Sequence, residues 1–249
     1  MRRVLVVGIG AGDPEQITLE AVAALRRADV LFEIERATDS LTQARAELIA
    51  RHVTREPRIV GVAEPARDRR TPAYADAVRA WREQRAEVWE RAIEEHVGEE
   101  ACGAFLVWGD PSLYDSTIAV LESVRHRGRV AFRIEVIPGV SSVHALTARH
   151  RIALNRVGGA VLITTGRRLA EHGWPDGVDD VVVMLDAGGA FRRVIDEPLD
   201  IYWGAYLGTQ DEILRSGRLA EVADEIERVR ARARERKGWI MDCYLLRRP

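Results

Sequence analysis

Short apolar runs alternate with longer amphipathic segments through roughly the first 150 residues of the chain. A short apolar run that ends at glycine or proline is typical of a buried strand, and apolar residues one helical turn apart are typical of a helix face. Strands are therefore predicted at residues 4–9, 30–34, 58–62, 104–108 and 133–137, and helices at residues 18–25, 41–52, 72–97 and 116–125. This alternation favours a mostly parallel sheet with helices on its faces.

The pattern changes in the last part of the chain. Strand-like runs at 161–165, 181–185, 201–207 and 239–246 are separated by short connections and by one charged segment, 211–237, which is predicted to be a helix. We therefore expect two α/β domains, residues 1–150 and 151–249, with the joint at 149–155. The helix predicted at 72–97 carries Trp81 and Trp89 among many charges, so both are expected to be partly exposed.

The charged residues are unusual in kind. Lys237 is the only lysine among 37 basic residues, so 36 (37 − 1) are arginine, and the formal net charge is -2. GC-rich codon usage explains such a bias; guanidinium groups also suit carboxylates and phosphates better than ammonium groups do, and both explanations can hold. The small net charge and the lack of a basic stretch interleaved with aromatics argue against nucleic-acid binding.

Neither secretion, metal binding nor membrane insertion is indicated. Cys102 and Cys243 are far apart and lie in apolar stretches, which predicts reduced core residues rather than a disulfide or a metal site. No apolar run is long enough to span a membrane, and the first residues lead directly into a predicted strand. We expect a soluble cytoplasmic protein without a metal or a membrane partner.

Glycine-bearing loops follow three of the predicted strands. The first, residues 8–14, reads GIGAGDP. Its third glycine comes two residues after the second, where the dinucleotide-binding fingerprint needs three, and Pro14 delays the next helix. Taken alone, a tight turn without a ligand explains this loop equally well.

The other two loops carry polar side chains. Residues 108–115 read WGDPSLYD, and residues 136–142 read VIPGVSS. Asp110 is either a turn former or a ligand contact, and Ser141 and Ser142 can cap the next helix or hold a polar ligand. Because ligands gather beyond the carboxyl ends of parallel strands, we favour ligand contact for the 108–115 loop and expect the three loops to meet at one crevice.

In order and spacing, the three loops together resemble the tetrapyrrole methylase family, and the resemblance covers the whole chain. The family comprises S-adenosylmethionine (SAM)-dependent methyltransferases of cobalamin and sirohaem synthesis, with relatives that act on ribosomal RNA and diphthamide. The resemblance implies two α/β domains with SAM bent in the cleft between them, S-adenosylhomocysteine as product, and a homodimer.

Further segments narrow the resemblance. They are residues 108–117 (WGDPSLYDST), 148–155 (ARHRIALN), 163–169 (ITTGRRL), 201–209 (IYWGAYLGT) and 238–248 (GWIMDCYLLRR). They are similar to the members that methylate ring carbon C-1 of precorrin-5 and release the extruded carbon as acetate, giving precorrin-6A. The nearest alternative is a methyltransferase of the same fold that acts on another precorrin position.

Carried over position by position, the resemblance implies a set of cofactor contacts. They are Ala11, Trp108, Gly109, Asp110, Leu113, Ser141, Ser142, Leu185, Gly204 and Ala205. Leu185 stands where a methionine is common in the family, and another apolar side chain can still pack on adenine. Asp110 can act through its carboxylate on the methionine amino group or through its backbone.

Methyl transfer from a sulfonium requires alignment and exclusion of water, but no covalent protein nucleophile. The acids or bases considered for acetate release are Asp110, Tyr114 and Asp115, with Asp68 and Asp242 as further candidates, and nothing in the sequence ranks them. The carboxylates of a precorrin are expected to need bidentate cations. The favoured substrate-binding residues are Arg67, Arg69, Arg70, Arg167 and Arg168.

Two other classes stay open. A nicotinamide-dependent oxidoreductase is the alternative enzyme, and the glycine spacing of the first loop counts against it. A non-catalytic ligand-binding protein is the other, because a fold alone does not prove activity.

Overall fold

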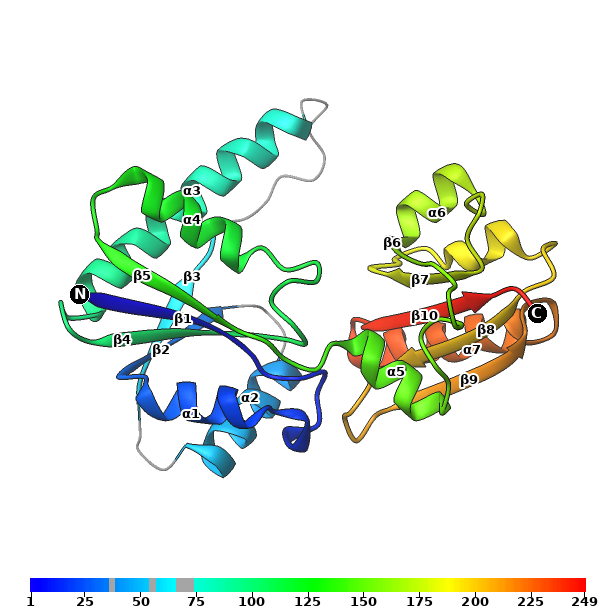
Figure 1. Cartoon of the computed structure of the whole chain (residues 1–249), viewed down its shortest axis with the longest axis horizontal. Helices are drawn as coiled ribbons and strands as arrows, with labels where there is room; N and C mark the ends of the chain where they lie inside the picture. Colours follow the sequence, from blue (N-terminus) through cyan, green and yellow to red (C-terminus); the bar gives the residue numbers. More distant parts are fainter. Residues whose placement is uncertain (36–38, 54–56, 66–73) are drawn as a thin grey trace. The chain divides into compact units, whose positions relative to one another are not determined.

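The computed structural model describes residues 1–35, 39–53, 57–65 and 74–249. The chain divides into two compact units, one of Met1–Gly10 and Pro14–Val140 and the other of Ala11–Asp13 and Ser141–Pro249. Each unit contains one five-stranded sheet with flanking helices, so the predicted α/β class is confirmed (Figure 1). The division between the units precedes helix α5 (Ser142–His150), whereas the expected joint follows it. This helix belongs to the second unit because it packs against the strands of the second sheet.

The first unit is a parallel α/β sandwich. Its elements are β1 (Arg2–Gly8), η1 (Pro14–Gln16), α1 (Leu19–Arg27), β2 (Val30–Glu35), α2 (Asp39–His52), β3 (Arg58–Ala63), α3 (Tyr74–His96), β4 (Cys102–Val107), α4 (Thr117–Arg127) and β5 (Phe132–Ile137). The strand order is β3-β2-β4-β1-β5, and every pair is parallel. The strands and helices predicted for this part are confirmed, with ends that differ by a few residues.

Strand β1 lies inside this sheet and is buried on both faces. Val4 and Val6 belong to the apolar cluster under α3 and α4, whereas Leu5 and Val7 belong to the cluster under α1. Successive side chains of a strand point to opposite faces, so one apolar run supplies both clusters. A strand buried in this way fixes its carboxyl end, where the first glycine loop begins.

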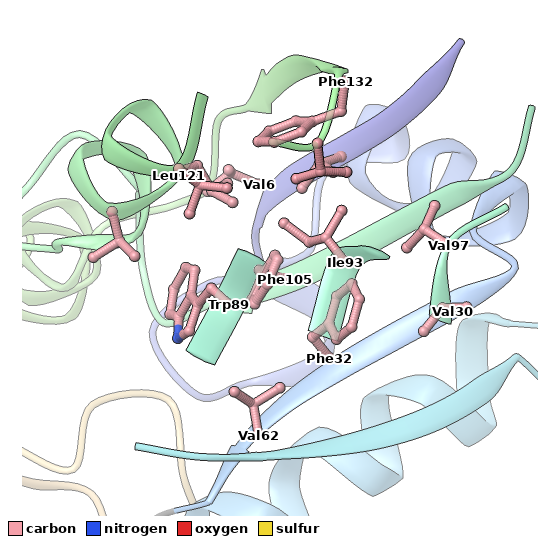
Figure 2. Packing of buried hydrophobic residues seen from close by; sticks show 14 of the residues in the cluster. Val6, Val30, Phe32, Val62, Trp89, Ile93, Val97, Phe105, Leu121 and Phe132 are labelled. Atoms are coloured by element: carbon pink, nitrogen blue, oxygen red, sulfur yellow. The ribbon is translucent and has the colours of Figure 1, made fainter. Parts of the chain in front are cut away.

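Aromatic rings lie among aliphatic side chains in the cluster under α3 (Figure 2). Phe105 of β4 stacks on Phe32 with ring centroids 4.6 Å apart and on Trp89 with centroids 4.3 Å apart. Trp89 is fully buried, so the expectation that it is partly exposed was wrong. Its helix carries many charges, but the face that bears Trp89 is the one packed on the sheet; Trp81 is half-buried.

The second unit has a mixed sheet. Its elements are α5, β6 (Val161–Thr165), α6 (Gly166–His172), β7 (Asp180–Met184), η2 (Ala190–Val194), β8 (Asp200–Ala205), β9 (Ile213–Arg218), α7 (Leu219–Lys237) and β10 (Asp242–Arg247). The order is β6-β7-β10-β8-β9; β6 and β7 are parallel, and the other pairs are antiparallel. The last strand of the chain therefore lies in the middle of the sheet.

One predicted helix was too long. Residues 213–218 form β9 rather than the start of the helix predicted at 211–237, and they pair with β8 along its length. Ser216 and Gly217 are poor helix formers, and Gly217 has a φ of 150°, so this stretch favours an edge strand. The seven-residue helix α6 was not predicted because it is too short to show a clear helical period.

Candidate functional site

Three glycines from three loops meet at one edge of the first sheet. Gly8 ends β1, Gly109 follows β4 and Gly139 follows β5, and β1 lies between the other two strands. A Cβ atom on Gly139 would lie 2.2 Å from the carbonyl oxygen of Gly109, and one on Gly8 would lie 2.6 Å from the Gly139 nitrogen. The three loops therefore adjoin, as predicted, and only glycine allows their backbones to come this close.

The first two loops are also hydrogen-bonded to each other. The Gly109 N–H donates to the Gly10 carbonyl at 2.8 Å, and the Gly10 N–H donates to the Gly109 carbonyl at 3.4 Å. Both residues have positive φ, 85° for Gly10 and 67° for Gly109, which glycine adopts without strain. The first loop thus continues the contact between its strand and β4 beyond the end of the sheet.

The next residues of the first loop pack in the second unit. Ala11 is buried. Gly12 has a φ of 152°, and a Cβ atom there would lie 2.7 Å from the Leu207 carbonyl oxygen and from Thr209 Cγ2. The loop is therefore pressed against the turn that follows β8, and its third glycine is required by that contact.

Asp110 ties the second loop to the third. Its Oδ1 accepts hydrogen bonds from the Ser112 N–H at 2.8 Å and from the Ser112 hydroxyl, and its Oδ2 accepts from the Gly139 N–H at 2.9 Å. Both carboxylate oxygens thus have donors within the protein. The geometry favours a positioning role, one of the two roles that the sequence left open.

The side chains around Asp110 differ in exposure. Trp108 is half-buried, and its indole Nε1 is buried without a hydrogen-bond partner among the described residues. The Arg45 guanidinium lies 5.7 Å from the centroid of the Trp108 ring. Leu113 is half-buried, and Tyr114 is 45% exposed with a φ of 53°. A non-glycine residue with such a φ is uncommon and often marks a functional site.

Polar side chains accept hydrogen bonds from backbone N–H groups at the starts of two helices. Asp115 Oδ1 accepts from the Thr117 N–H at 2.6 Å at the start of α4. The Ser141 hydroxyl accepts from the His144 N–H at 3.4 Å and lies 2.8 Å from His144 Nδ1 at the start of α5. Ser141 is buried and Ser142 half-buried. The capping role that the sequence allowed for Ser141 is therefore present; a ligand can still contact the loop beside it.

The expected contacts farther along the chain fall in different environments. Leu185, at the end of β7, is 65% exposed. Ala205 is fully buried. A Cβ atom on Gly204 would lie 2.7 Å from Leu207 Cδ2 and 2.8 Å from Leu146 Cδ1. Of the three expected contacts, Leu185 alone presents a side chain to solvent.

The substrate-binding arginines are only partly described. Arg167 and Arg168 lie in the first turn of α6, and both are exposed. Among the described residues, Arg167 makes one ion pair, of 4.0 Å, with Glu171 on the same helix. Arg67, Arg69 and Arg70 fall outside the described residues, as does Asp68.

A buried ion pair beside the second loop was not predicted. Arg85 of α3 is 2% exposed, and its guanidinium donates to Glu64 Oε1 at 2.7 Å and to the Ser116 hydroxyl at 2.8 Å. Glu64 also accepts from the Trp89 indole at 3.2 Å. Arg85 therefore holds the segment after β3 to the end of the loop that contains Asp110. No periodicity marks such a residue, because a charged residue in a helix normally faces solvent.

A second unpredicted network lies under Leu185. Asp186 is 6% exposed and accepts a hydrogen bond of 2.7 Å from the hydroxyl of Tyr244, which is fully buried. Burial and the neighbouring Asp186 raise the pKa of Tyr244 well above its ordinary value, so the hydroxyl stays protonated. The Asp-Ala-Gly-Gly run at 186–189 is turn chemistry that indicates a loop but not a buried carboxylate.

His150 and the two cysteines add little chemistry. Burial lowers the pKa of His150, whose Nε2 donates to the Trp203 carbonyl at 3.0 Å. Cys102 and Cys243 are buried and free, and burial raises the pKa of Cys243 to about 12. In the part of the chain that the structure describes, no group of three His, Cys, Asp or Glu side chains is arranged to hold a metal. None of the described helices is long and apolar enough to cross a membrane.

An apolar cavity of about 70 Å³ lies between α2 and the first sheet. Its lining includes Leu31, Ile49, Ile59 and Leu106, together with Glu33 and Arg45. None of the predicted site residues lines it.

The chain matches known proteins along its full length. A precorrin-6A synthase [deacetylating] of Sinorhizobium sp. is 51% identical over 251 aligned residues, which cover 100% of this chain and 96% of that protein. The crystal structure of a cobalamin-synthesis-related protein of Corynebacterium diphtheriae superposes with a TM-score of 0.87 at 37% identity, over 99% of this chain and 98% of that one.

A more distant structure agrees in fold. The uroporphyrin-III C-methyltransferase of Thermus thermophilus, crystallised with S-adenosylhomocysteine, superposes with a TM-score of 0.61 at 22% identity, over 98% of this chain and 91% of that one. The family model of tetrapyrrole (corrin/porphyrin) methylases matches residues 3–223. With its three adjoining glycine loops and its two α/β units, this chain belongs to the tetrapyrrole (corrin/porphyrin) methylases, a family of SAM-dependent methyltransferases.

Proposed function

We propose that this chain is a SAM-dependent C-methyltransferase of cobalamin synthesis that methylates C-1 of precorrin-5 and releases acetate, giving precorrin-6A. The observation that carries this assignment is the 51% identity, over the whole length of the chain, to a precorrin-6A synthase [deacetylating]. The alignment covers both units, so no large segment of this chain lacks a counterpart in that protein.

The residues around the three loops fit a sulfonium nucleoside. Trp108 has an indole N–H that is buried and unpaired among the described residues, and Leu113 and Leu185 offer apolar surface for adenine. We assign the cofactor contacts to Ala11, Trp108, Gly109, Leu113, Ser141, Ser142 and Leu185. Asp110 is assigned mainly to holding Gly139, and Gly204 and Ala205 to supporting the turn that packs on Gly12.

The protein contributes alignment and exclusion of water. When bound beside these loops, SAM would supply an electrophilic methyl group to the ring carbon and would leave as S-adenosylhomocysteine. Holding two reactants in a productive geometry can lower the barrier by about 7–11 kcal/mol in favourable cases. The hydrogen bonds of Asp110 and the bridge between Gly10 and Gly109 fix the loop backbones before any ligand arrives, so little conformational entropy is lost on binding.

Acetate release consumes water and needs a proton donor or acceptor. Of the candidate acids and bases, both oxygens of Asp110 are occupied and Asp115 Oδ1 accepts a hydrogen bond from the Thr117 N–H, whereas Tyr114 is 45% exposed in the same loop. We therefore assign proton transfer to Tyr114, with Asp115 as the nearby alternative.

The carboxylates of the substrate need cations. We assign Arg167 and Arg168, together with Arg67, Arg69 and Arg70, to the acetate and propionate groups, because guanidinium groups bind carboxylates in a bidentate fashion. Arg167 and Arg168 are exposed, and Arg167 has only a 4.0 Å ion pair within the described residues to give up.

The purified protein, incubated with methyl-labelled SAM and precorrin-5, tests the assignment. Equal molar yields of methylated corrin and acetate are expected. Methylation without acetate would favour the rival activity at another precorrin position, and absence of methyl transfer would contradict the assignment altogether.

Thermal unfolding with a panel of ligands distinguishes a SAM-dependent methyltransferase from a nicotinamide-dependent oxidoreductase. S-adenosylhomocysteine is expected to raise the melting temperature, because a ligand that binds only the folded state stabilises it. NAD and an oligonucleotide are expected to leave the melting temperature unchanged. Stabilisation by NAD alone would support an oxidoreductase. We further propose that the protein is cytoplasmic. We also propose that it forms a homodimer, and analytical ultracentrifugation of the purified protein tests this oligomeric state.

A further inference from the structure

A buried carboxylate organises the turn that follows β7. Asp186 Oδ1 accepts hydrogen bonds from the N–H groups of Gly188 at 3.0 Å and Gly189 at 2.9 Å, and Oδ2 accepts from the N–H of Ala190 at 2.7 Å. The Tyr244 hydroxyl donates the fourth bond, also to Oδ2. A buried carboxylate is costly unless it is fully hydrogen-bonded, and this one is.

Helix α7 also contributes hydrogen bonds to the backbone of this turn. Arg230 of α7 is 8% exposed and donates to the carbonyl oxygens of Asp186 and, at 3.5 Å, Ala187. The same guanidinium donates through Nε to Asp242 at 2.7 Å. Thus β7, β10 and α7 all contribute to the conformation of one turn.

Gly166, at the start of α6, packs directly against the Asp186 side chain. A Cβ atom there would lie 2.5 Å from Asp186 Cγ, so the carboxylate fits only because residue 166 has no side chain. The position of Asp186 is therefore determined by packing as well as by hydrogen bonds.

Leu185, directly before this carboxylate, is unfavourable in two respects. Its φ is 52°, in the left-handed region that is sterically unfavourable for a non-glycine residue, and its side chain is 65% exposed. Such a conformation persists only where the surroundings impose it, and it concentrates at ligand sites. A leucine in a surface turn with no ligand to meet would gain from either a different backbone or a polar replacement.

We infer, on the basis of the proposed function, that Asp186 and Tyr244 are positioning residues that hold Leu185 in its strained, exposed conformation so that its side chain packs on the adenine of the cofactor. Neither residue touches the ligand. Removing either one is expected to weaken cofactor binding only through Leu185.

A double-mutant cycle on the affinity for S-adenosylhomocysteine, measured by calorimetry, tests this inference. Leu185→Ala is expected to raise Kd about ten-fold through loss of apolar contact. Tyr244→Phe is expected to raise Kd by about three-fold or more through loss of one hydrogen bond to Asp186. In the Leu185→Ala background, Tyr244→Phe should change Kd by no more than roughly 1.5-fold, because the side chain that it positions is gone.

A general structural role would give a different result. If Tyr244→Phe weakens binding by the same factor in both backgrounds, or in neither, the inference is overturned. Asp186→Asn provides a stronger form of the same cycle where that variant folds. Tyr202→Phe, on the neighbouring strand β8, is the matched control and should leave Kd unchanged in both backgrounds.

The wild-type protein separates the two levels of the assignment. If it does not bind S-adenosylhomocysteine, the proposed cofactor use and the inference fail together. If it binds but the two substitutions act independently, the inference alone fails.

Discussion

The carboxylate of Asp110 accepts a hydrogen bond of 2.9 Å from the backbone N–H of Gly139, across the gap between the loops that follow β4 and β5. The two residues are 29 positions apart, and β1 lies between their strands. A single side chain therefore fixes the separation of two loops on which the proposed cofactor contacts depend.

Asp110→Ala is expected to weaken binding of S-adenosylhomocysteine about ten-fold or more. The variant leaves the Gly139 and Ser112 N–H groups without their acceptor, and a hydrogen bond to a charged group contributes about 1.5–3 kcal/mol. Calorimetry measures the change. Ser112→Ala is the control: it removes one exposed hydroxyl that donates to Asp110 Oδ1 but keeps both backbone N–H bonds, so it should weaken binding less than Asp110→Ala does. Unchanged affinity in Asp110→Ala would remove this residue from the account of the site.

Gly139→Ala is expected to lower the free energy of unfolding by about 1–3 kcal/mol or more, the usual cost of forced overpacking. The added methyl would lie 2.2 Å from the Gly109 carbonyl oxygen, so the backbones must separate. Urea unfolding measures the loss. The control is Gly98→Ala in the same unit, where the nearest atom to the added methyl is 3.7 Å away and φ is not positive. Equal stabilities of the two variants would mean that the loops are not packed as described.

Arg85→Met is expected to cost about 3–5 kcal/mol of stability, because it leaves the largely buried Glu64 carboxylate without its cationic partner and with the Trp89 indole as a neutral donor. Adding Glu64→Gln to the same chain should recover part of that loss. Arg79→Met, on the same helix, removes an exposed ion pair to Asp76 and should cost about 0.5 kcal/mol or less. If Arg85→Met and Arg79→Met prove equally stable in denaturant, the buried pair has no structural role.

His150 should make the protein less stable in acid. Burial lowers its pKa below the ordinary value of 6.5, so the unfolded chain takes up a proton before the folded chain does. Its contribution is therefore neutral above pH 6.5, and stability is lost as the pH falls through 6.5 toward the lower folded-state pKa. His150→Gln, which keeps a donor for the Trp203 carbonyl, should show a smaller loss over that range. Identical pH profiles of unfolding free energy for the two proteins would contradict this assignment.

Local patterns predicted much of this fold. The apolar run of β1, the cap-and-helix pattern of α1 and the strand at residues 161–165 all depend on neighbouring residues, so their positions could be derived from the sequence. The edge strand β9 could not, since its pairing with β8 overrides a charged segment that continues into a helix. The burial of Trp89 likewise depends on which helix face meets the sheet.

The candidate site was predictable where glycine and aspartate signal backbone geometry. The Gly-Asp-Pro runs and Gly139 identified the loops that adjoin at one edge of the first sheet. Arg85 and Asp186 were not foreseen, because their roles arise from partners far along the chain, Glu64 and Tyr244. Buried charge networks of this kind carry no local sequence signal.

A crystal structure of the protein with S-adenosylhomocysteine is the decisive experiment for the proposed cofactor site. The nucleoside is expected to contact Trp108, Gly109 and Leu113 and to lie against the loop edge formed by Gly8, Gly109 and Gly139, with adenine on Leu185. A bound nucleoside away from those loops, or loops that separate so that Asp110 no longer reaches Gly139, would contradict it.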